Sequence, residues 1–471
     1  MTVSGPPATD PGPEPERERE REPEREPEDG RTPGRADAVP ADGVPASGVR
    51  ADGVPARAAD RLRRHWAAWS GGVLFPRQAA VARIGFSLTF AAFLLREWPN
   101  RLLLYGDRSP FSGPMARLLL SDNGAFTVLA WSDGRFWFEL VYTLAFAVSL
   151  ALALGWRTRA MSVLFMVAVL SLQNRAVLVG DGSDNVLHIM AIYLAFTRCG
   201  EAWSLDARRR RRRSGDGAAT TSTVSAGAVY ATPADLVDVL LWALLGLALL
   251  LAQLTGFAKL GMLAMSGWGA VFWAFWALSG LRRLSGLRRL PRLRRLTARQ
   301  PSAPAGLDQL LDGLGNLLHG CALFVMAAEA CLIYGTAGWY KIQGDLWQRG
   351  TALWFPLHLD YFSPWPALSH ALAAHPLPVF LLSYGTVAVQ VGFPFLVFHR
   401  RIKNLLLVAL IAEHLGIAVL LGLPLFSAAM IAADLLFLPT TFLLRVERAT
   451  DSGVLRYRHW RAHTNHSNQR Y

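Results

Sequence analysis

The feature that most constrains this chain is a series of apolar segments separated by short clusters of arginine. Most of the segments are about 20 residues long, the length at which a helix spans the ~30 Å hydrocarbon core of a bilayer. Lipid offers the backbone no hydrogen-bond partners, so such segments cross it as helices that satisfy their own polar groups. The pattern therefore predicts an all-α fold, a polytopic transmembrane helix bundle.

We expect about ten spans, of which one pair is an inserted hairpin. The predicted spans are residues 77–95, 136–155, 160–179, the short 182–196, 236–257, 262–281, 317–340, 378–398, 405–423 and 424–444. Segment 101–120 is also rich in leucine, but Pro110 and Pro114 interrupt it. We expect short surface-lying or re-entrant helices there rather than a crossing.

The arginine clusters predict the orientation of the bundle. With the N-terminus in the cytoplasm, every strong cluster falls on the cytoplasmic side, as the positive-inside rule requires. These clusters are Arg157 with Arg159, 208–213, 282–299, 399–403 and 445–461. We therefore expect a cell-membrane protein with both termini in the cytoplasm and the lipid bilayer as its surroundings. The formal net charge of +13 then needs no nucleic-acid partner.

Composition divides the chain into five regions. Residues 1–60 alternate charged residues with proline and bury too little to fold, so they are predicted to be a disordered cytoplasmic tail. Residues 61–206 and 311–445 are predicted to form the two parts of the membrane domain. Residues 207–310 are an insertion that contains a basic loop, the hairpin and a basic amphipathic segment at 281–299. Residues 446–471 are a basic cytoplasmic tail.

Lys341 is the most distinctive candidate for chemistry, because it follows directly on the apolar run 321–340. A lysine at the centre of a membrane helix costs roughly 2.5–3.5 kcal/mol on insertion scales. Lys341 can avoid this cost by extending its ammonium to the headgroups, which is the interpretation that spacing alone favours. The alternative is a partly desolvated amine that acts as a base.

Three motifs occur along the chain in a fixed order. They are Ala337-Gly338-Trp339-Tyr340-Lys341 followed by Trp347 and 358–360; 184–188 leading to 199–206; and 413–415 leading to 433–439. In sequence and in order, across about residues 75–444, these motifs resemble the HTTM family of bacterial membrane proteins. That family is related to the vitamin K-dependent gamma-carboxylase. The inserted hairpin departs from the family pattern.

The resemblance implies a function and a site. In the carboxylase, a lysine in the A-G-x-x-K position is the base that deprotonates vitamin K hydroquinone, and this catalytic role passes to Lys341. A catalytic histidine of the same enzyme has His188 as its nearest counterpart. The implied cofactor is a quinol, either menaquinol or vitamin K hydroquinone. The predicted topology places Asn185, His358 and Asp360 at the same outer face, and we assign them with Trp347 to cofactor binding.

Two functional classes remain open from the sequence. The first is a quinol-dependent oxygenase, epoxidase or carboxylase-like enzyme; glutamate carboxylation itself is the less expected reaction, because we find no counterpart of the carboxylase domain that recognises the protein substrate. The second is a non-catalytic transporter or accessory factor for secretion or lipid handling. No metal-ligand cluster is apparent, so no metal site is predicted.

Charged residues inside the predicted spans should face the bundle interior and find partners there. These residues are Glu139, Glu329, Glu413, His414 and Asp434. Glu413 and His414 are candidates for a proton relay, but adjacent residues on a helix point about 100° apart. Structural pairing is the interpretation that we favour from sequence.

Overall fold

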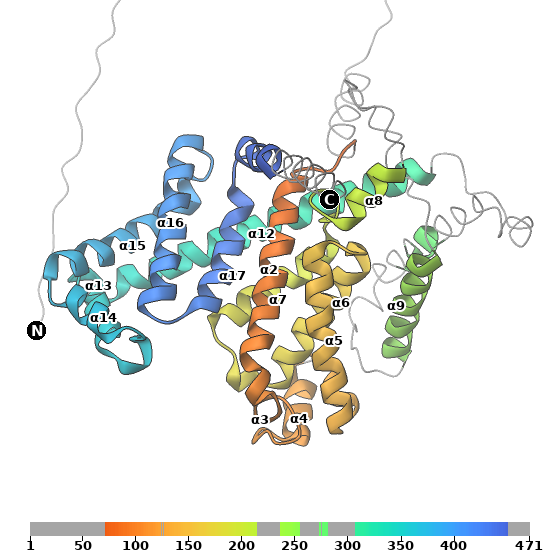
Figure 1. Cartoon of the computed structure of the whole chain (residues 1–471), viewed down its shortest axis with the longest axis horizontal. Coiled ribbons are helices and arrows are strands. Elements are labelled where there is room, and N and C mark those ends of the chain that lie inside the picture. Colours follow the sequence, from red (N-terminus) through yellow and green to blue (C-terminus); the bar gives the residue numbers. More distant parts are fainter. Residues whose placement is uncertain are drawn as a thin grey trace, which may run out of the picture. The chain divides into compact units, whose positions relative to one another are not determined.

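The chain divides into two units, Met1–Ala56 and Arg57–Tyr471. The computed structural model describes residues 71–123, 125, 127–213, 236–254, 273–274, 276–280 and 307–450, all within the second unit, and these residues contain helices but no strands (Figure 1). The all-α prediction is confirmed. The predicted tail 1–60, the amphipathic segment 281–299 and nearly all of the predicted tail 446–471 lie outside the described residues.

Nine longer helices make up the described bundle. They are α2 (Pro76–Glu97), α5 (Arg135–Leu154), α6 (Thr158–Arg175), α7 (Gly182–Phe196), α9 (Leu236–Leu254), α12 (Leu307–Gln343), α15 (Pro376–Leu396), α16 (Arg400–Leu420) and α17 (Pro424–Asp434). Their bounds follow the predicted spans, except that α12 and α16 begin ten and five residues earlier than predicted, and α6 and α17 end earlier than predicted.

Shorter helical segments connect the long ones. They are η1 (Trp98–Asn100), α3 (Arg101–Leu104), α4 (Gly113–Asn123), η2 (Val128–Trp131), η3 (Val177–Val179), α8 (Leu205–Arg213), α13 (Asp345–Gln348), η4 (Ala352–Trp354), η5 (Pro356–His358), η6 (Asp360–Phe362), α14 (Pro366–Ala373) and η7 (Leu435–Phe437). Helices α3 and α4 confirm that segment 101–120 forms short helices. Residues 208–213, predicted as a loop, are instead the end of α8, where Arg210 forms a 2.8 Å ion pair with Glu201.

Among the described residues, six helices are long and apolar enough to cross a membrane. The count rises to seven if the bent pair Pro424–Phe437 and Thr440–Thr450 is one span. The prediction of about ten spans was made for the whole chain, and one of the ten, 262–281, lies largely outside the described residues. Helices α6 and α7 are not among the six. The predicted span 424–444 is broken by a bend of 105°. Pro439 causes the break, because it holds Leu438 in an extended conformation (ψ 136°) that a helix cannot continue through.

The predicted hairpin is described only in part, as α9 and residues 273–274 and 276–280. Trp242 on α9 stacks on Trp276 with ring centroids 3.9 Å apart, and Trp273 Nε1 donates a hydrogen bond of 3.2 Å to Gln253 Oε1. Moving forward along α9 from 242 to 253, the contacted position moves backward from 276 to 273. Segments that pair in this reversed order are antiparallel, as a hairpin requires.

Helices that follow one another along the chain are neighbours in the bundle. Helix α2 packs on α5, α5 on α6, and α6 on α7; in the second part α12 packs on α15, α15 on α16, and α16 on α17. Contacts of α17 with α2 and of α12 with α7 join the two parts. Gly85 on α2 allows the close approach of α17, because a Cβ there would lie 2.6 Å from the Cβ of Ala432.

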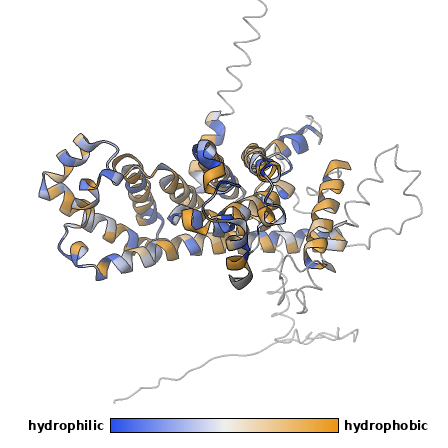
Figure 2. Ribbon diagram, turned by 90° about the horizontal axis from the view of Figure 1, so that it is seen from below, coloured by the Kyte–Doolittle hydropathy of each residue, from blue (hydrophilic) through white to orange (hydrophobic). Residues whose placement is uncertain are grey.

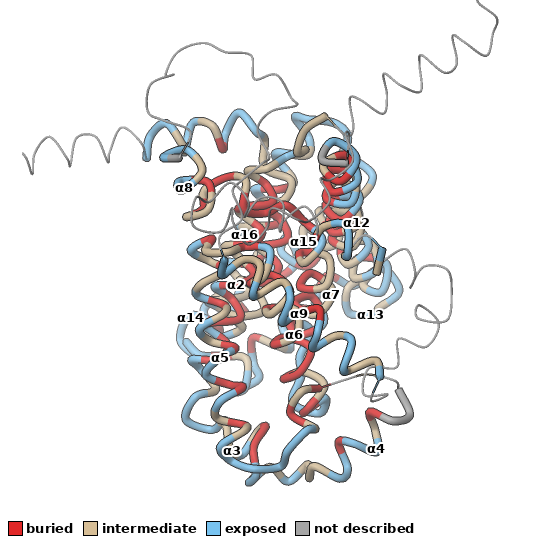
Figure 3. The backbone as a smooth tube through the Cα atoms, turned by 90° about the vertical axis from the view of Figure 1, so that its right-hand side faces the viewer, coloured by how far each residue is buried: buried red, intermediate tan, exposed pale blue. Residues whose placement is uncertain are grey.

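Burial differs strongly between the helices. The most apolar window of α2 is 67% buried, whereas that of α16 is 17% buried (Figure 3). Figure 2 shows hydrophobic residues along much of the helical part of the chain, and many of them are exposed. Phe324, Phe395 and Phe398 are among the most exposed, at 74%, 77% and 90%. Apolar side chains that face outward are expected where lipid is the solvent.

Ion pairs join neighbouring segments at both ends of α2 and α5. At one end the guanidinium of Arg157 pairs with Asp238, and Arg77 pairs with Glu447 at 2.8 Å. At the other end Arg101 pairs with Glu139. Gly155 closes the turn between α5 and α6 with φ +73°, a conformation that glycine adopts without strain. The end that carries Arg157 is the one that we predict to be cytoplasmic.

Candidate functional site

Lys341 lies in the last turn of α12, and its side chain is half-buried. Nζ donates a hydrogen bond of 2.9 Å to Gln390 Oε1 on α15. The indole of Trp347 covers the same amine, with its ring centroid 5.3 Å from Nζ. The amine is therefore held inside the bundle by two contacts. This geometry fits the interpretation of a partly desolvated amine better than that of an ammonium extended to the headgroups.

Gln390 connects Lys341 to a carboxylate. While its Oε1 accepts from Lys341, its Nε2 donates a hydrogen bond of 2.5 Å to Glu413 Oε1 on α16. Gln390 is only 5% exposed. We name Lys341, Gln390 and Glu413 the amine chain. It draws one residue from each of three helices and places a neutral amide between an amine and a carboxyl group.

The glycine of the Ala337–Lys341 motif makes this chain possible. A Cβ at Gly338 would lie 2.6 Å from Val391 Cγ2 and 3.1 Å from the backbone nitrogen of Val391. Only a residue without a side chain lets α12 approach α15 so closely. Lys341, one turn further along α12, then reaches Gln390, which is adjacent to Val391.

A second polar cluster lies nearby, on α12, α16 and α17. Tyr334 Oη is 2.9 Å from His414 Nε2 on α16 and donates a hydrogen bond of 2.9 Å to Asp434 Oδ1 on α17. All three side chains are buried, at 1%, 2% and 0% exposure. Tyr334 precedes Lys341 by seven residues, which is about 10 Å along α12. We name Tyr334, His414 and Asp434 the tyrosine cluster.

Four of the five charged residues predicted to find partners in the bundle do so. Arg101 holds Glu139 through two hydrogen bonds of 3.0 and 2.9 Å, and Glu413, His414 and Asp434 belong to the two polar groups above. Glu329 is half-buried and has no partner within the described part of the chain. The prediction is not confirmed for this residue.

His188 lies apart from Lys341. Its Nδ1 is 3.1 Å from Gln173 Oε1, and Gln173 Nε2 donates to the backbone oxygen of Asp184 at 2.8 Å. Within the described residues, no hydrogen bond or ion pair joins His188 to Lys341. The geometry along the helices agrees. The two helices meet where the backbone nitrogen of Arg198, just after α7, donates a hydrogen bond of 3.0 Å to His319 on α12. From this contact Lys341 lies about 33 Å away along α12, whereas His188 lies only about 15 Å away along α7. The two residues are therefore at different depths.

The residues predicted to bind a cofactor are dispersed. Trp347 contacts Lys341, as described above. Asn185 and Asp360 are exposed and make no contact with Lys341. His358 is exposed as well, with Nδ1 2.7 Å from the oxygen of Trp354 and its ring stacked 5.5 Å from that of His370. The sequence singles out Glu413 by its charge, but it does not single out Gln390 or Tyr334, whose spacing within the apolar runs is not distinctive.

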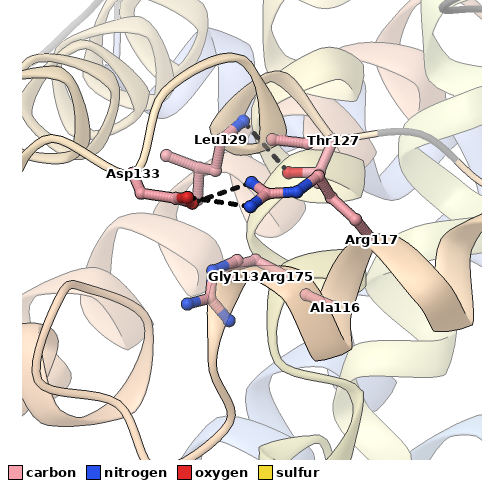
Figure 4. Close-up of a pocket in the computed structure, with 8 residues that line it drawn as sticks. Gly113, Ala116, Arg117, Thr127, Leu129, Asp133 and Arg175 are labelled. Atoms are coloured by element: carbon pink, nitrogen blue, oxygen red, sulfur yellow. Dashed lines mark hydrogen bonds and ion pairs between the residues drawn. The ribbon is translucent and has the colours of Figure 1, made fainter.

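A pocket also lies outside this site, in the short helices that precede α5. Figure 4 shows the bidentate pair of Arg117 with Asp133, both 2.9 Å hydrogen bonds, beside Arg175. The pocket encloses about 170 Å³ of empty space, open solvent included. The hollow has no enclosed space large enough for a water molecule, so it cannot hold a quinol. In the described ranges, no group of three or more His, Cys, Asp or Glu could hold a metal ion.

Comparison with known proteins assigns no family. No protein-family model, no curated protein and no solved structure matches this chain. The resemblance to the HTTM family stays a prediction, and the chain's own geometry must support any function.

Proposed function

We propose that this chain is a multi-pass membrane enzyme in which Lys341 takes a proton from a quinol that arrives through the lipid. The main support for this proposal is a pair of hydrogen bonds. Lys341 Nζ donates to Gln390 Oε1, and Gln390 Nε2 donates to Glu413 Oε1. A lysine that only anchors a helix end gains nothing from a buried amide partner. An amine that exchanges protons needs a fixed position and a nearby group that stabilises its charged form.

The surroundings of Lys341 fit an apolar substrate with a phenolic hydroxyl. The amine is half-buried, so one side of it is reachable, and Trp339 and Tyr340 beside it are 60% and 73% exposed. Aromatic side chains at a helix end are suited to the lipid–water interface, where a quinol headgroup also resides. Trp347 adds a flat apolar surface next to the amine. A quinol would thus meet Lys341 from the membrane side.

Each residue of the amine chain has a distinct role in this proposal. Neutral Lys341 accepts the phenolic proton and becomes an ammonium. Gln390 fixes the position of the amine by accepting its hydrogen bond at Oε1. Its Nε2 donates to Glu413 and so holds that residue near the amine. The carboxylate of Glu413 stabilises the ammonium at a distance without direct contact. A quinol supplies an acidic hydroxyl and, on oxidation, two electrons for a reaction with oxygen.

A transporter is the second candidate, and the tyrosine cluster favours it. Buried ionisable groups within membrane helices commonly mark proton or ion pathways. A transporter that uses protons requires such groups but does not require a quinol. The two candidates therefore differ in whether the protein binds a quinol at Lys341.

Co-purification of a quinone tests the proposal. Wild-type protein purified in mild detergent should carry an isoprenoid quinone that mass spectrometry can identify. Lys341→Ala should lose most of it, while Lys403→Ala, which removes an amine that binds the backbone oxygen of Phe437 at the other end of the bundle, should retain it. Equal amounts in both variants, or no quinone in the wild type, would contradict the proposal.

A further inference from the structure

We propose that Tyr334, His414 and Asp434 form a proton relay inside the helix bundle. The three residues come from α12, α16 and α17, and Tyr334 Oη stands between the other two at 2.9 Å from each. Both distances are in the range of good hydrogen bonds. A hydroxyl is the one group in this cluster that can donate and accept at the same time, so its central position is what a relay requires.

The relay moves a proton from His414 to Asp434 in two transfers through Tyr334. His414 gives its Nε2 proton to the oxygen of Tyr334, and Tyr334 gives its own hydroxyl proton to Asp434 Oδ1. The imidazolium becomes an imidazole and the carboxylate becomes a carboxylic acid. Tyr334 ends as it began, as a neutral phenol. The reverse transfer uses the same two hydrogen bonds.

The outer atoms of the cluster are suited to be its entrance and exit. His414 Nδ1 and Asp434 Oδ2 are buried, and within the described residues neither has a hydrogen-bond partner. A buried polar atom without a partner is costly to a fold. A cluster that served stability alone would be expected to satisfy both atoms. Atoms that receive and release protons must instead be open to a transient partner.

The groups around the cluster connect it to the amine chain. Lys341 acts electrostatically on His414, and Glu413 acts on Tyr334 and Asp434. The rings that pack on the cluster are apolar: Phe393 on α15 contacts Tyr334, and Phe426 on α17 contacts His414. The charge of Lys341 and Glu413 therefore biases where the proton of the cluster resides.

If Lys341 takes a proton from a quinol, the tyrosine cluster is placed to carry a proton away from that end of the bundle. This role rests on the proposed function. The relay itself rests only on the geometry of the three side chains, so it can be tested without any quinol.

The test is an infrared titration of the full-length protein in lipid nanodiscs. The carboxylic acid signal of Asp434 is identified by its loss in Asp434→Asn, and the imidazole signal of His414 by its loss in His414→Gln. In the wild type the two signals should change over the same pH range, because one proton is shared between them. In Tyr334→Phe they should separate by about one pH unit or more.

Tyr340→Phe is the matched control, since Tyr340 lies on the same helix and is 73% exposed. It should titrate as the wild type does. If Tyr334→Phe does not fold, Asp434→Asn is measured instead. In that variant the pH midpoint of the His414 signal should move. Separate titration in the wild type, joint titration in Tyr334→Phe, or an unmoved His414 midpoint in Asp434→Asn would overturn the relay. None of these results depends on whether the protein turns over a quinol.

Discussion

Gly338 on α12 faces Val391 on α15 at a distance that leaves no room for a side chain, since a Cβ at position 338 would lie 2.6 Å from Val391 Cγ2. The contact lies one residue from Gln390 in sequence and one turn from Lys341. The glycine therefore sets the separation across which the amine chain is built. This explains the glycine of the Ala337–Lys341 motif by packing alone.

Gly338→Ala should destabilise the protein and weaken the amine chain. The added methyl group must push α12 and α15 apart, and overpacking of this kind costs about 1–3 kcal/mol. The apparent Tm in detergent should fall. Gly385→Ala on α15 is the matched control, because a Cβ there meets nothing within 4 Å. A Tm for Gly338→Ala equal to that of Gly385→Ala would contradict the packing argument.

Asp206→Ala should also lower the Tm, through the start of α6. The carboxylate of Asp206 accepts hydrogen bonds from the backbone nitrogens of Arg157 and Thr158 at 2.9 and 2.8 Å. Loss of a cap costs about 0.5–2 kcal/mol, typically ~1. Asp107→Ala serves as the control, because Asp107 is exposed and has no partner within the described ranges. Equal Tm values for the two variants would show that α6 needs no cap from Asp206.

The pair of Arg117 with Asp133 should give a small dependence of stability on pH. The hydrogen bond from Arg117 lowers the pKa of Asp133. The stabilisation is therefore present above the unfolded pKa of about 3.9 and is lost as the pH falls through the lower, folded value. Both side chains are largely exposed, at 42% and 57%, so the pair is worth roughly 0.2–1 kcal/mol.

Asp133→Asn checks this linkage. At about pH 7 and low salt its Tm should lie slightly below that of the wild type, and the difference should shrink in high salt and in strong acid. A difference that grows as the pH falls would have the wrong sign for this pair.

The helices were predictable because lipid imposes a simple rule on the sequence. An apolar run of about 20 residues can hardly be anything but a helix in a membrane, and proline or arginine marks its ends. The break at Pro439 was missed because the run 424–444 is apolar on both sides of it. The helical form of 208–213 was missed because the arginine run was read for its charge, whereas Arg is also a good helix former.

The site was less predictable because its key contacts join distant helices. The motif pointed to Lys341, and the cost of burying charge pointed to Glu413, His414 and Asp434. Nothing in the spacing of Gln390 or Tyr334 shows that one lies beside Lys341 and the other between His414 and Asp434. His188 contacts Gln173 and not Lys341 because His188 and Lys341 lie at different depths along their helices. That depth depends on the tilt and length of α12, which periodicity does not give.

The orientation can be tested with alkaline-phosphatase fusions. The arginine distribution predicts that a fusion after Arg295 is cytoplasmic and inactive, while a fusion after Lys341 is exported and active. Fusions of equal expression level provide the comparison. The opposite pattern of activity would show that the end carrying Lys341 faces the cytoplasm.

The most direct test of the role of Lys341 is oxygen-dependent oxidation of menaquinol or vitamin K hydroquinone by the reconstituted protein. If Lys341 is the base, wild-type vesicles should oxidise the quinol, whereas Lys341→Ala and Lys341→Arg should both be inactive although folded. Arginine fails because a guanidinium stays protonated and cannot accept the proton. Full activity in Lys341→Arg would contradict the account, because it would show that a positive charge at this helix end is all that the protein requires.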